Sequence, residues 1–340
     1  MEEDASDEKE LTEKISLCGE TGRLNRDSVG WSRAPVHDCA LPGSWGRRKR
    51  WDYWCVTSPE IVVTLTYANV DYLGIADIWV LERATGRTAS ASRVVPLAIG
   101  FSQPDEVGAE TIRYSKGSFE IVLAEDSGGT QLLSRAPGRN IACDIFVERP
   151  DGHETMSVVI PWSETEFQCT TKENTRPASG WVEAFEQRFE LPVGESWGCL
   201  DYGRGKWPYS TVWNWGSASG TQGGRVVGLQ LGGKWTDGTG MTENALCVDG
   251  RLTKIGEELT WEYDSGNWLA PWRIFTPNSD KIDLTLRPDH DKASRLELGV
   301  LSSTVHQCFG QYSGAIVSGE GERIEIDSLF GWAEEARWRW

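Results

Sequence analysis

The sequence contains no run of about eighteen apolar residues, which excludes a helix that crosses a membrane. Its first residues are acidic and lack the basic and apolar segments of a secretory signal, so we predict a cytoplasmic protein. Basic residues are scarce as well: 34 lysines and arginines against 51 aspartates and glutamates leave a formal net charge of -17. This balance argues against nucleic acid or an anionic membrane surface as a partner.

Residues that hold metals and cofactors are not grouped in the sequence. The eight cysteines occur without a CxxC pair and the four histidines without an HExxH motif, so we predict no metal site. A phosphate-binding loop and the GxSxG turn of α/β-hydrolases are also missing. We therefore expect no cofactor, and we expect the thiols to be reduced and mostly buried.

Tryptophan, in contrast, is in excess, with 18 residues, roughly four times the average usage. Eight of them fall within residues 197–272, and several adjoin polar residues. Such clustering is typical of an aromatic-lined cavity that holds an apolar or sugar-like ligand.

Short runs of β-branched and aromatic residues, bounded by Gly, Pro, Asp or Ser, recur along the chain, as at 60–68 and 322–329. About fifteen such runs predict an all-β fold of two packed antiparallel barrels or sandwiches with few short helices. We place a disordered acidic tail at 1–16, an N-terminal domain at 17–175 and a C-terminal domain at 176–340.

The stretch 201–250 combines twelve glycines with polar residues set between tryptophans. Glycine permits close approach of the backbone to a ligand, and polar groups buried among rings need partners. We predict that this stretch is one wall of a binding site. The expected ligand-contacting residues are Asp201, Arg204, Trp207, Trp213, Asn214, Trp215, Lys234, Trp235 and Asn244, with His306 at the cavity mouth.

Some of these residues have a simpler interpretation. Asp201 and Arg204 also fit an ion pair that stabilises a loop, and His306 also fits a hydrogen-bonded core histidine.

Two carboxylates of this stretch, Asp237 and Glu243, are candidates for catalysis. They flank a glycine-rich turn, and burial in an aromatic pocket would favour the neutral form that donates a proton near neutral pH. The alternative is structural: Asp237 would cap a turn through its own backbone, and Glu243 would pair with Lys234 or an arginine.

Several long motifs resemble the family called domain of unknown function 2804. They include GWSRAPVHDC at 30–39, LDYGRGKWPYSTVWNWGSASG at 200–220, LGGKWTDGTGMTENALCVDGRLTKI at 231–255 and HQCFGQYSG at 306–314, and the resemblance covers about 17–340. That family is distantly similar to proteins with two lipocalin-like barrels, among them carotenoid hydratases, tocopherol cyclase and fungal decalin-forming cyclases. The resemblance implies an apolar ligand held between two β halves and a reaction such as cyclisation, hydration or isomerisation.

Three functions remain open on the sequence. The first is an enzyme that acts on an isoprenoid- or polyene-like molecule, with tryptophans stabilising developing positive charge. The second is a non-catalytic carrier or sensor of such a hydrophobic ligand. The third is a carbohydrate-active protein, because tryptophans stack on sugars and paired carboxylates hydrolyse glycosides.

Overall fold

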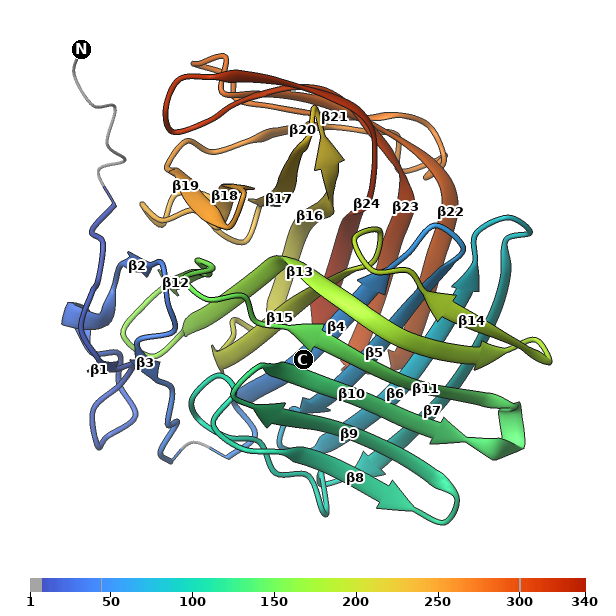
Figure 1. The fold of residues 1–340 in the computed structure, drawn as a ribbon. Helices are drawn as coiled ribbons and strands as arrows, with labels where there is room; N and C mark the ends of the chain where they lie inside the picture. Colours follow the sequence, from blue (N-terminus) through green and yellow to red (C-terminus); the bar gives the residue numbers. More distant parts are fainter. Residues whose placement is uncertain (1–7, 44, 300) are drawn as a thin grey trace.

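Strands dominate the computed structural model, which describes residues 8–43, 45–299 and 301–340. Within these ranges helix is limited to two 3-10 turns, Arg26–Ser28 and Pro137–Arg139. None of the described helical segments is long and apolar enough to cross a membrane. The strands form two large curled antiparallel sheets that pack against each other (Figure 1), which confirms the predicted all-β class.

The first sheet has thirteen strands, and its main path runs β7-β6-β5-β4-β15-β13-β11-β10-β9-β8. Its strands are β2 (Trp31–Ser32), β4 (Arg48–Thr57), β5 (Ile61–Asn69), β6 (Leu73–Glu82), β7 (Arg87–Pro96), β8 (Ile112–Lys116), β9 (Phe119–Asp126), β10 (Gly129–Ala136), β11 (Ile141–Glu148), β12 (Met156–Pro161), β13 (Phe167–Ala184), β14 (Gln187–Leu191) and β15 (Trp197–Lys206). Two further strands, β1 (Ile15–Ser16) and β3 (His37–Asp38), form a small parallel pair.

The second sheet has nine strands in the order β19-β18-β17-β16-β24-β23-β22-β21-β20. They are β16 (Ser210–Gln222), β17 (Arg225–Gly233), β18 (Asn244–Val248), β19 (Arg251–Ile255), β20 (Thr260–Glu262), β21 (Trp272–Phe275), β22 (Ile282–Leu298), β23 (Leu301–Val317) and β24 (Arg323–Arg339).

The chain passes from the first sheet to the second between Lys206 and Ser210. The domain boundary placed at residue 175 from the sequence falls inside β13 instead. β13 pairs with β12 and β15 along its first half and with β11 and β14 along its second half, so it runs through the middle of the first sheet. The polar residues of β13 resemble those of a linker. They are accommodated in the middle of a sheet because strands on both sides satisfy the backbone hydrogen bonds of β13.

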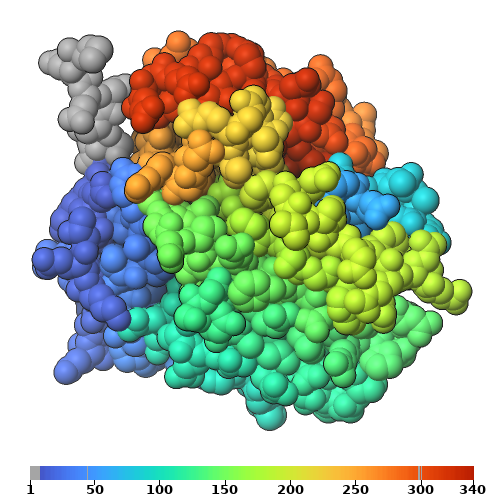
Figure 2. Space-filling model, viewed as in Figure 1, coloured from blue at the N-terminus to red at the C-terminus, as the bar shows by residue number. Residues whose placement is uncertain are grey.

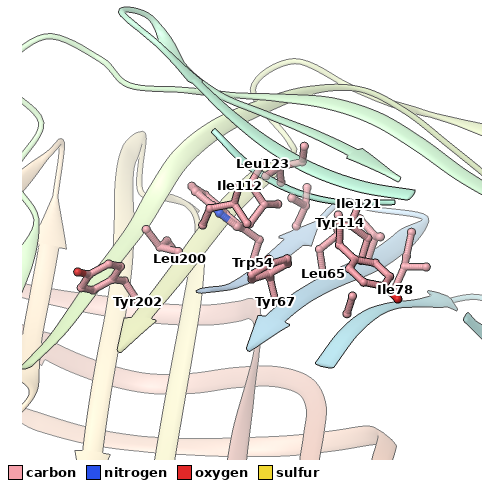
Figure 3. Packing of buried hydrophobic residues seen from close by; sticks show 14 of the residues in the cluster. Trp54, Leu65, Tyr67, Ile78, Ile112, Tyr114, Ile121, Leu123, Leu200 and Tyr202 are labelled. Atoms are coloured by element: carbon pink, nitrogen blue, oxygen red, sulfur yellow. The ribbon is translucent and has the colours of Figure 1, made fainter. Parts of the chain in front are cut away.

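Alternation along the strands gives each sheet two different faces. Even-numbered residues of β15, such as Leu200 and Tyr202, point into the core of the first sheet together with Trp54, Leu65 and Ile121 (Figure 3). The odd-numbered residues point the other way, toward the second sheet. The interface between the sheets is therefore built from the faces that these two cores leave free.

The N-terminal segment lies along the side of the molecule, beside both sheets (blue in Figure 2). Residues 1–7 of the expected disordered tail lie outside the described residues, whereas residues 8–16 are placed. The carboxylate of Glu8 is buried and receives hydrogen bonds from the backbone and hydroxyl of Thr242, both at 2.9 Å. Its other oxygen lies 2.6 Å from the Lys254 ammonium. The order of this segment thus comes from a buried ion pair with the second sheet.

The hairpin between β18 and β19 turns at Asp249 and Gly250. Asp249 and Gly250 both have positive φ, 48° and 77°, as a two-residue hairpin turn of this kind requires.

Candidate active site between the two sheets

A row of polar residues crosses the first sheet on the face turned toward the second. Strand register places them side by side on five neighbouring strands, so they share one face. The residues of this row are Asp77 on β6, Thr66 on β5, Tyr53 on β4, Asp201 on β15 and Lys172 on β13.

A second row crosses the facing sheet. Register aligns Lys292 on β22 with Gln307 on β23, Gln307 with Glu334 on β24, and Glu334 with Trp215 on β16. These four side chains point toward the first sheet.

The two rows contact each other directly. The Tyr53 hydroxyl donates to Gln307 Oε1 at 3.0 Å, and the Lys172 ammonium lies 4.3 Å above the Trp215 ring. Together with Glu243, which projects into the same space, the two rows form what we call the central polar layer.

Glu243 enters this layer from the loop before β18, and its side chain is 1% exposed. Its Oε1 accepts a hydrogen bond from Trp235 Nε1 at 2.5 Å, and its Oε2 lies 3.6 Å from Lys172 Nζ. The close packing depends on Gly232, where a Cβ atom would lie 2.1 Å from Glu243 Cγ.

Burial raises the pKa of Glu243 to about 7, although Lys172 and the Trp235 hydrogen bond favour the ionised form. The nearer partner of Lys172 is Asp201, at 2.8 Å. Burial alone would lower the pKa of Lys172, but Asp201 and then Glu243 outweigh burial and raise it above 10.5. The charged pair is therefore Lys172 with Asp201, and Glu243 takes up a proton near neutral pH.

Glu334 is the second buried acid of the layer. Among the described residues only Trp213 hydrogen-bonds to its carboxyl group, with Nε1 2.9 Å from Oε1. Burial raises the pKa of Glu334 to about 7, opposed by the Trp213 hydrogen bond and by the more distant charges of Lys292 and Lys172. Near neutral pH a large fraction of Glu334 is a neutral carboxylic acid that has a proton to donate.

Seven tryptophans cover one end of the layer, and we call them the tryptophan wall. Trp207 lies at its centre, stacked on Trp235 with ring centroids 5.2 Å apart and contacting Trp213 at 5.5 Å. The wall consists of Trp51, Trp162, Trp207, Trp213, Trp235, Trp338 and Trp340. Trp213 and Trp235 carry the hydrogen bonds to Glu334 and Glu243, so the wall and the acids form one unit.

Six residues expected at the site from the sequence come together here. Glu243, Asp201 and Trp215 belong to the central polar layer, and Trp207, Trp213 and Trp235 belong to the tryptophan wall.

Arg204 and Asn244 instead bind other parts of the protein. Arg204 lies on the opposite face of β15 from Asp201, is 0% exposed and pairs with Asp52 at 2.9 Å. The loop ion pair considered for Asp201 and Arg204 is thus wrong: both lie on a strand, and their side chains diverge. Asn244 accepts the backbone N–H of Gly232 at 2.6 Å.

A separate polar group lies on the inner face of the second sheet. Lys234 pairs with Glu335 at 2.6 Å, and Asn214 donates to the Tyr263 hydroxyl at 3.2 Å. His306 Nδ1 lies 2.8 Å from Asp291 on the same face, and its ring stacks on Trp268 at 4.1 Å. Register explains the separation, because Glu335 follows Glu334 by one position and His306 precedes Gln307 by one position. Both side chains therefore point to the face opposite the central polar layer.

Asp237 lies at the surface, whereas Glu243 is buried. The side chain of Asp237 is exposed, and Oδ1 accepts the backbone N–H of Lys234 at 2.9 Å, which closes the turn at the start of the loop. This contact is the turn-capping alternative raised by the sequence.

Sequence reasoning missed Lys172, Lys292 and Glu334. A signal was present for Glu334: the even-numbered positions from 330 to 340 read F, W, E, A, W, W. A single acid within an aromatic strand face indicates a carboxyl group buried among rings.

All eight cysteines are buried and unbridged in this structure. The described ranges contain no group of three or more His, Cys, Asp or Glu side chains placed to hold a metal ion.

The family of domain of unknown function 2804 matches residues 8–340, almost the whole sequence. The chain belongs to this family. Curated proteins offer no significant match to the sequence of this DUF2804 chain.

Solved structures with the same architecture are distant in sequence. An AttH-type protein from Nitrosomonas europaea is 11% identical, with a TM-score of 0.51 over 86% of this chain and 92% of that one. Kievitone hydratase from Nectria haematococca is 11% identical, with a TM-score of 0.50 over 86% and 88%. CghA with Sch210972 is 12% identical, with a TM-score of 0.45 over 88% and 89%. The likeness of the DUF2804 chain to the first two confirms the expected lipocalin-like fold and concerns the fold alone.

Proposed function

We propose that this protein binds an apolar, unsaturated molecule of the isoprenoid or polyene class between its two sheets and catalyses its acid-assisted cyclisation, hydration or isomerisation. The observation that carries the proposal is Glu334, a buried carboxylic acid with a pKa of about 7 that is hydrogen-bonded to an indole.

The chemistry follows from the surroundings of that acid. Glu334 transfers its proton to one carbon of a C=C bond, which leaves a carbocation on the neighbouring carbon and a carboxylate on the protein. The π faces of Trp213 and Tyr53 stabilise this cation. Return of a proton from a neighbouring carbon to the Glu334 carboxylate gives an isomer. Attack by a second C=C bond closes a ring and moves the cation to a new carbon, which then loses a proton to the same carboxylate. Addition of water followed by proton loss gives an alcohol.

Glu243 and Asp201 have supporting roles in this proposal. Asp201 fixes Lys172 over Trp215, and Glu243 holds Trp235 within the tryptophan wall. The residues proposed to contact the substrate are Trp207, Trp213, Trp215 and Trp235.

Deuterium uptake tests the proposal. The protein is incubated in D2O with farnesol, geranylgeraniol and squalene, and products are examined by mass spectrometry. We expect deuterium in a product of the wild type and a loss of about 10²- to 10⁴-fold in Glu334→Gln, the usual contribution of a general acid. Glu335→Gln is the matched control, because that side chain points to the opposite face of β24.

Other outcomes have definite meanings. Binding of these compounds without any deuterium uptake would contradict catalysis and support the carrier. Stabilisation against heat by sugars, and by none of the isoprenoids, would contradict the proposal in favour of the carbohydrate-active alternative. Equal uptake by Glu334→Gln and the wild type would remove Glu334 from the mechanism.

A further inference from the structure

A cleft of about 280 Å³ opens at the seam between the two sheets, at the end away from the tryptophan wall. Both sheets contribute to it: Ser58 and Arg83 come from the ends of β4–β6, and Gln311 and Phe330 come from β23 and β24. We call it the seam cleft.

Arg83 is the cation of this cleft. Its guanidinium lies 3.5 Å from the centroid of the Phe330 ring, and Nη1 donates to the Ser58 carbonyl at 2.6 Å. Among the described residues no carboxylate lies within 4.0 Å of Arg83, although Asp289 is near enough to raise its pKa against the effect of burial, which dominates and lowers it. Arginine has five N–H donors, so most remain available to an anion.

A second polar side chain, Gln311, lines the seam cleft together with Arg83. Gln311 Oε1 is buried and has no hydrogen-bond partner among the described residues. Its amide is therefore a further polar group in the cleft.

An aromatic path leads from the seam cleft to the central polar layer. Phe330 stacks on Phe309 at 6.3 Å, Phe309 contacts Trp332 at 5.8 Å, and Trp332 contacts Trp215 at 5.0 Å. Trp215 lies under Lys172, and Glu334 follows Trp332 on the same face of β24. These rings are buried, Phe330 partly, and they pack against one another and against the first sheet. An apolar chain that follows them would therefore have to displace them, and it would contact mainly apolar side chains until it reached the acids.

We propose that the seam cleft is the mouth of the active site and takes a substrate with one anionic end group, held by Arg83, while its apolar tail follows the aromatic path to Glu334. This assignment rests on the proposed function and names its substrate class. The arrangement keeps the anion at the rim, where it is solvated and paired, and avoids the cost of burying it between the sheets.

Binding of amphiphiles to the complete chain tests the assignment by calorimetry. The probes are dodecanoate, dodecyl phosphate and dodecanol below their micelle concentrations, with octanoate to test the tail. We expect both anions to bind at least about tenfold more tightly than dodecanol. We expect octanoate to bind more weakly than dodecanoate, because fewer CH₂ groups are buried. The ratio between the two anions reports whether a carboxylate or a phosphate is the preferred head group.

Arg83→Gln should remove the preference for anions over dodecanol. Arg93→Gln is the matched control, since Arg93 also lies over a phenylalanine, Phe119, at 4.7 Å and donates to a backbone carbonyl, but far from the cleft. Equal affinity for dodecanol and dodecanoate, an unchanged preference in Arg83→Gln, or the same loss in Arg93→Gln would overturn the assignment.

The two proposals fail separately. Glu334-dependent deuterium uptake by neutral isoprenoids without any preference for anions would overturn only the seam cleft. Arg83-dependent anion binding without turnover of any probe, including unsaturated acids such as farnesoate, would overturn only catalysis.

Discussion

Two adjacent glutamates of β24 should have opposite effects on stability as the pH changes. Glu334 faces the central polar layer, and its pKa rises from an ordinary 4.5 to about 7 because it is buried. Glu335 faces the other way; burial would raise its pKa as well, but hydrogen bonds from Lys234, Tyr263 and Arg337 outweigh burial and lower it. Two adjacent residues of one strand thus have pKa shifts of opposite sign.

The magnitude for Glu334 follows from this difference in pKa. Each pKa unit corresponds to about 1.4 kcal/mol, so keeping Glu334 ionised in the folded protein costs about 3 kcal/mol. The folded state holds a proton that the unfolded state releases between pH 4.5 and 7. The stability that Glu334 contributes is therefore complete below pH 4.5 and is lost as the pH rises through 7.

Glu334→Gln removes this titration while its amide oxygen can still accept the Trp213 hydrogen bond. We expect the variant to match the wild type near pH 4.5 and to exceed it by about 3 kcal/mol at pH 8. Glu335→Gln should do the reverse, since its stabilising contribution is present above pH 4.5 and is lost on acidification. Urea unfolding followed by fluorescence at several pH values measures both. If the unfolding free energies of Glu334→Gln and the wild type differ by the same amount at pH 4.5 and at pH 8, the raised pKa of Glu334 is refuted.

Three further substitutions test other parts of the structure. Arg204→Met should destabilise the fold by about 3–5 kcal/mol in urea unfolding, because it leaves the Asp52 carboxylate buried without a charged partner. Gly232→Ala should cost about 1–3 kcal/mol by the same measurement and displace Glu243, whose Cγ lies where the new methyl group would be. Asp237→Asn should leave turnover unchanged in the deuterium assay, because Asp237 is exposed and caps a turn.

Controls make these outcomes decisive. Gly138→Ala has nothing within 4 Å of the added Cβ, so a loss equal to that of Gly232→Ala would contradict the steric argument. A loss of turnover in Asp237→Asn as large as in Glu334→Gln would give the role of the acid to Asp237. Unchanged stability of Arg204→Met would show that its ion pair contributes no net stabilisation.

Local patterns were sufficient for much of the fold. β-Branched runs and the turn residues that separate them identified the all-β class. The turn at Asp249-Gly250 shows why such residues are informative, because its positive φ angles favour these two residue types. The clustering of tryptophans likewise indicated where an aromatic site would lie.

Glu334 and the two lysines of the central polar layer were harder to find. Lys172 lies in a polar run that resembles an exposed linker, and its partner Asp201 is on another strand. Glu334 and its donor Trp213 are 121 positions apart. Which face of a strand meets a second sheet depends on packing between distant segments, and no local pattern contains that information.

Alternation along β23 and β24 also restricts how the family can vary in length. A single residue inserted into β24 would turn Glu335 toward the central polar layer in place of Glu334, and one inserted into β23 would turn His306 toward it in place of Gln307. Either insertion would exchange the residues that face the central polar layer with those that face the inner side of the second sheet, whereas the turn at 318–321 can change length without affecting either face. Alignments of related chains should therefore show gaps at that turn and none within these strands, and libraries for directed evolution should confine insertions to the same place.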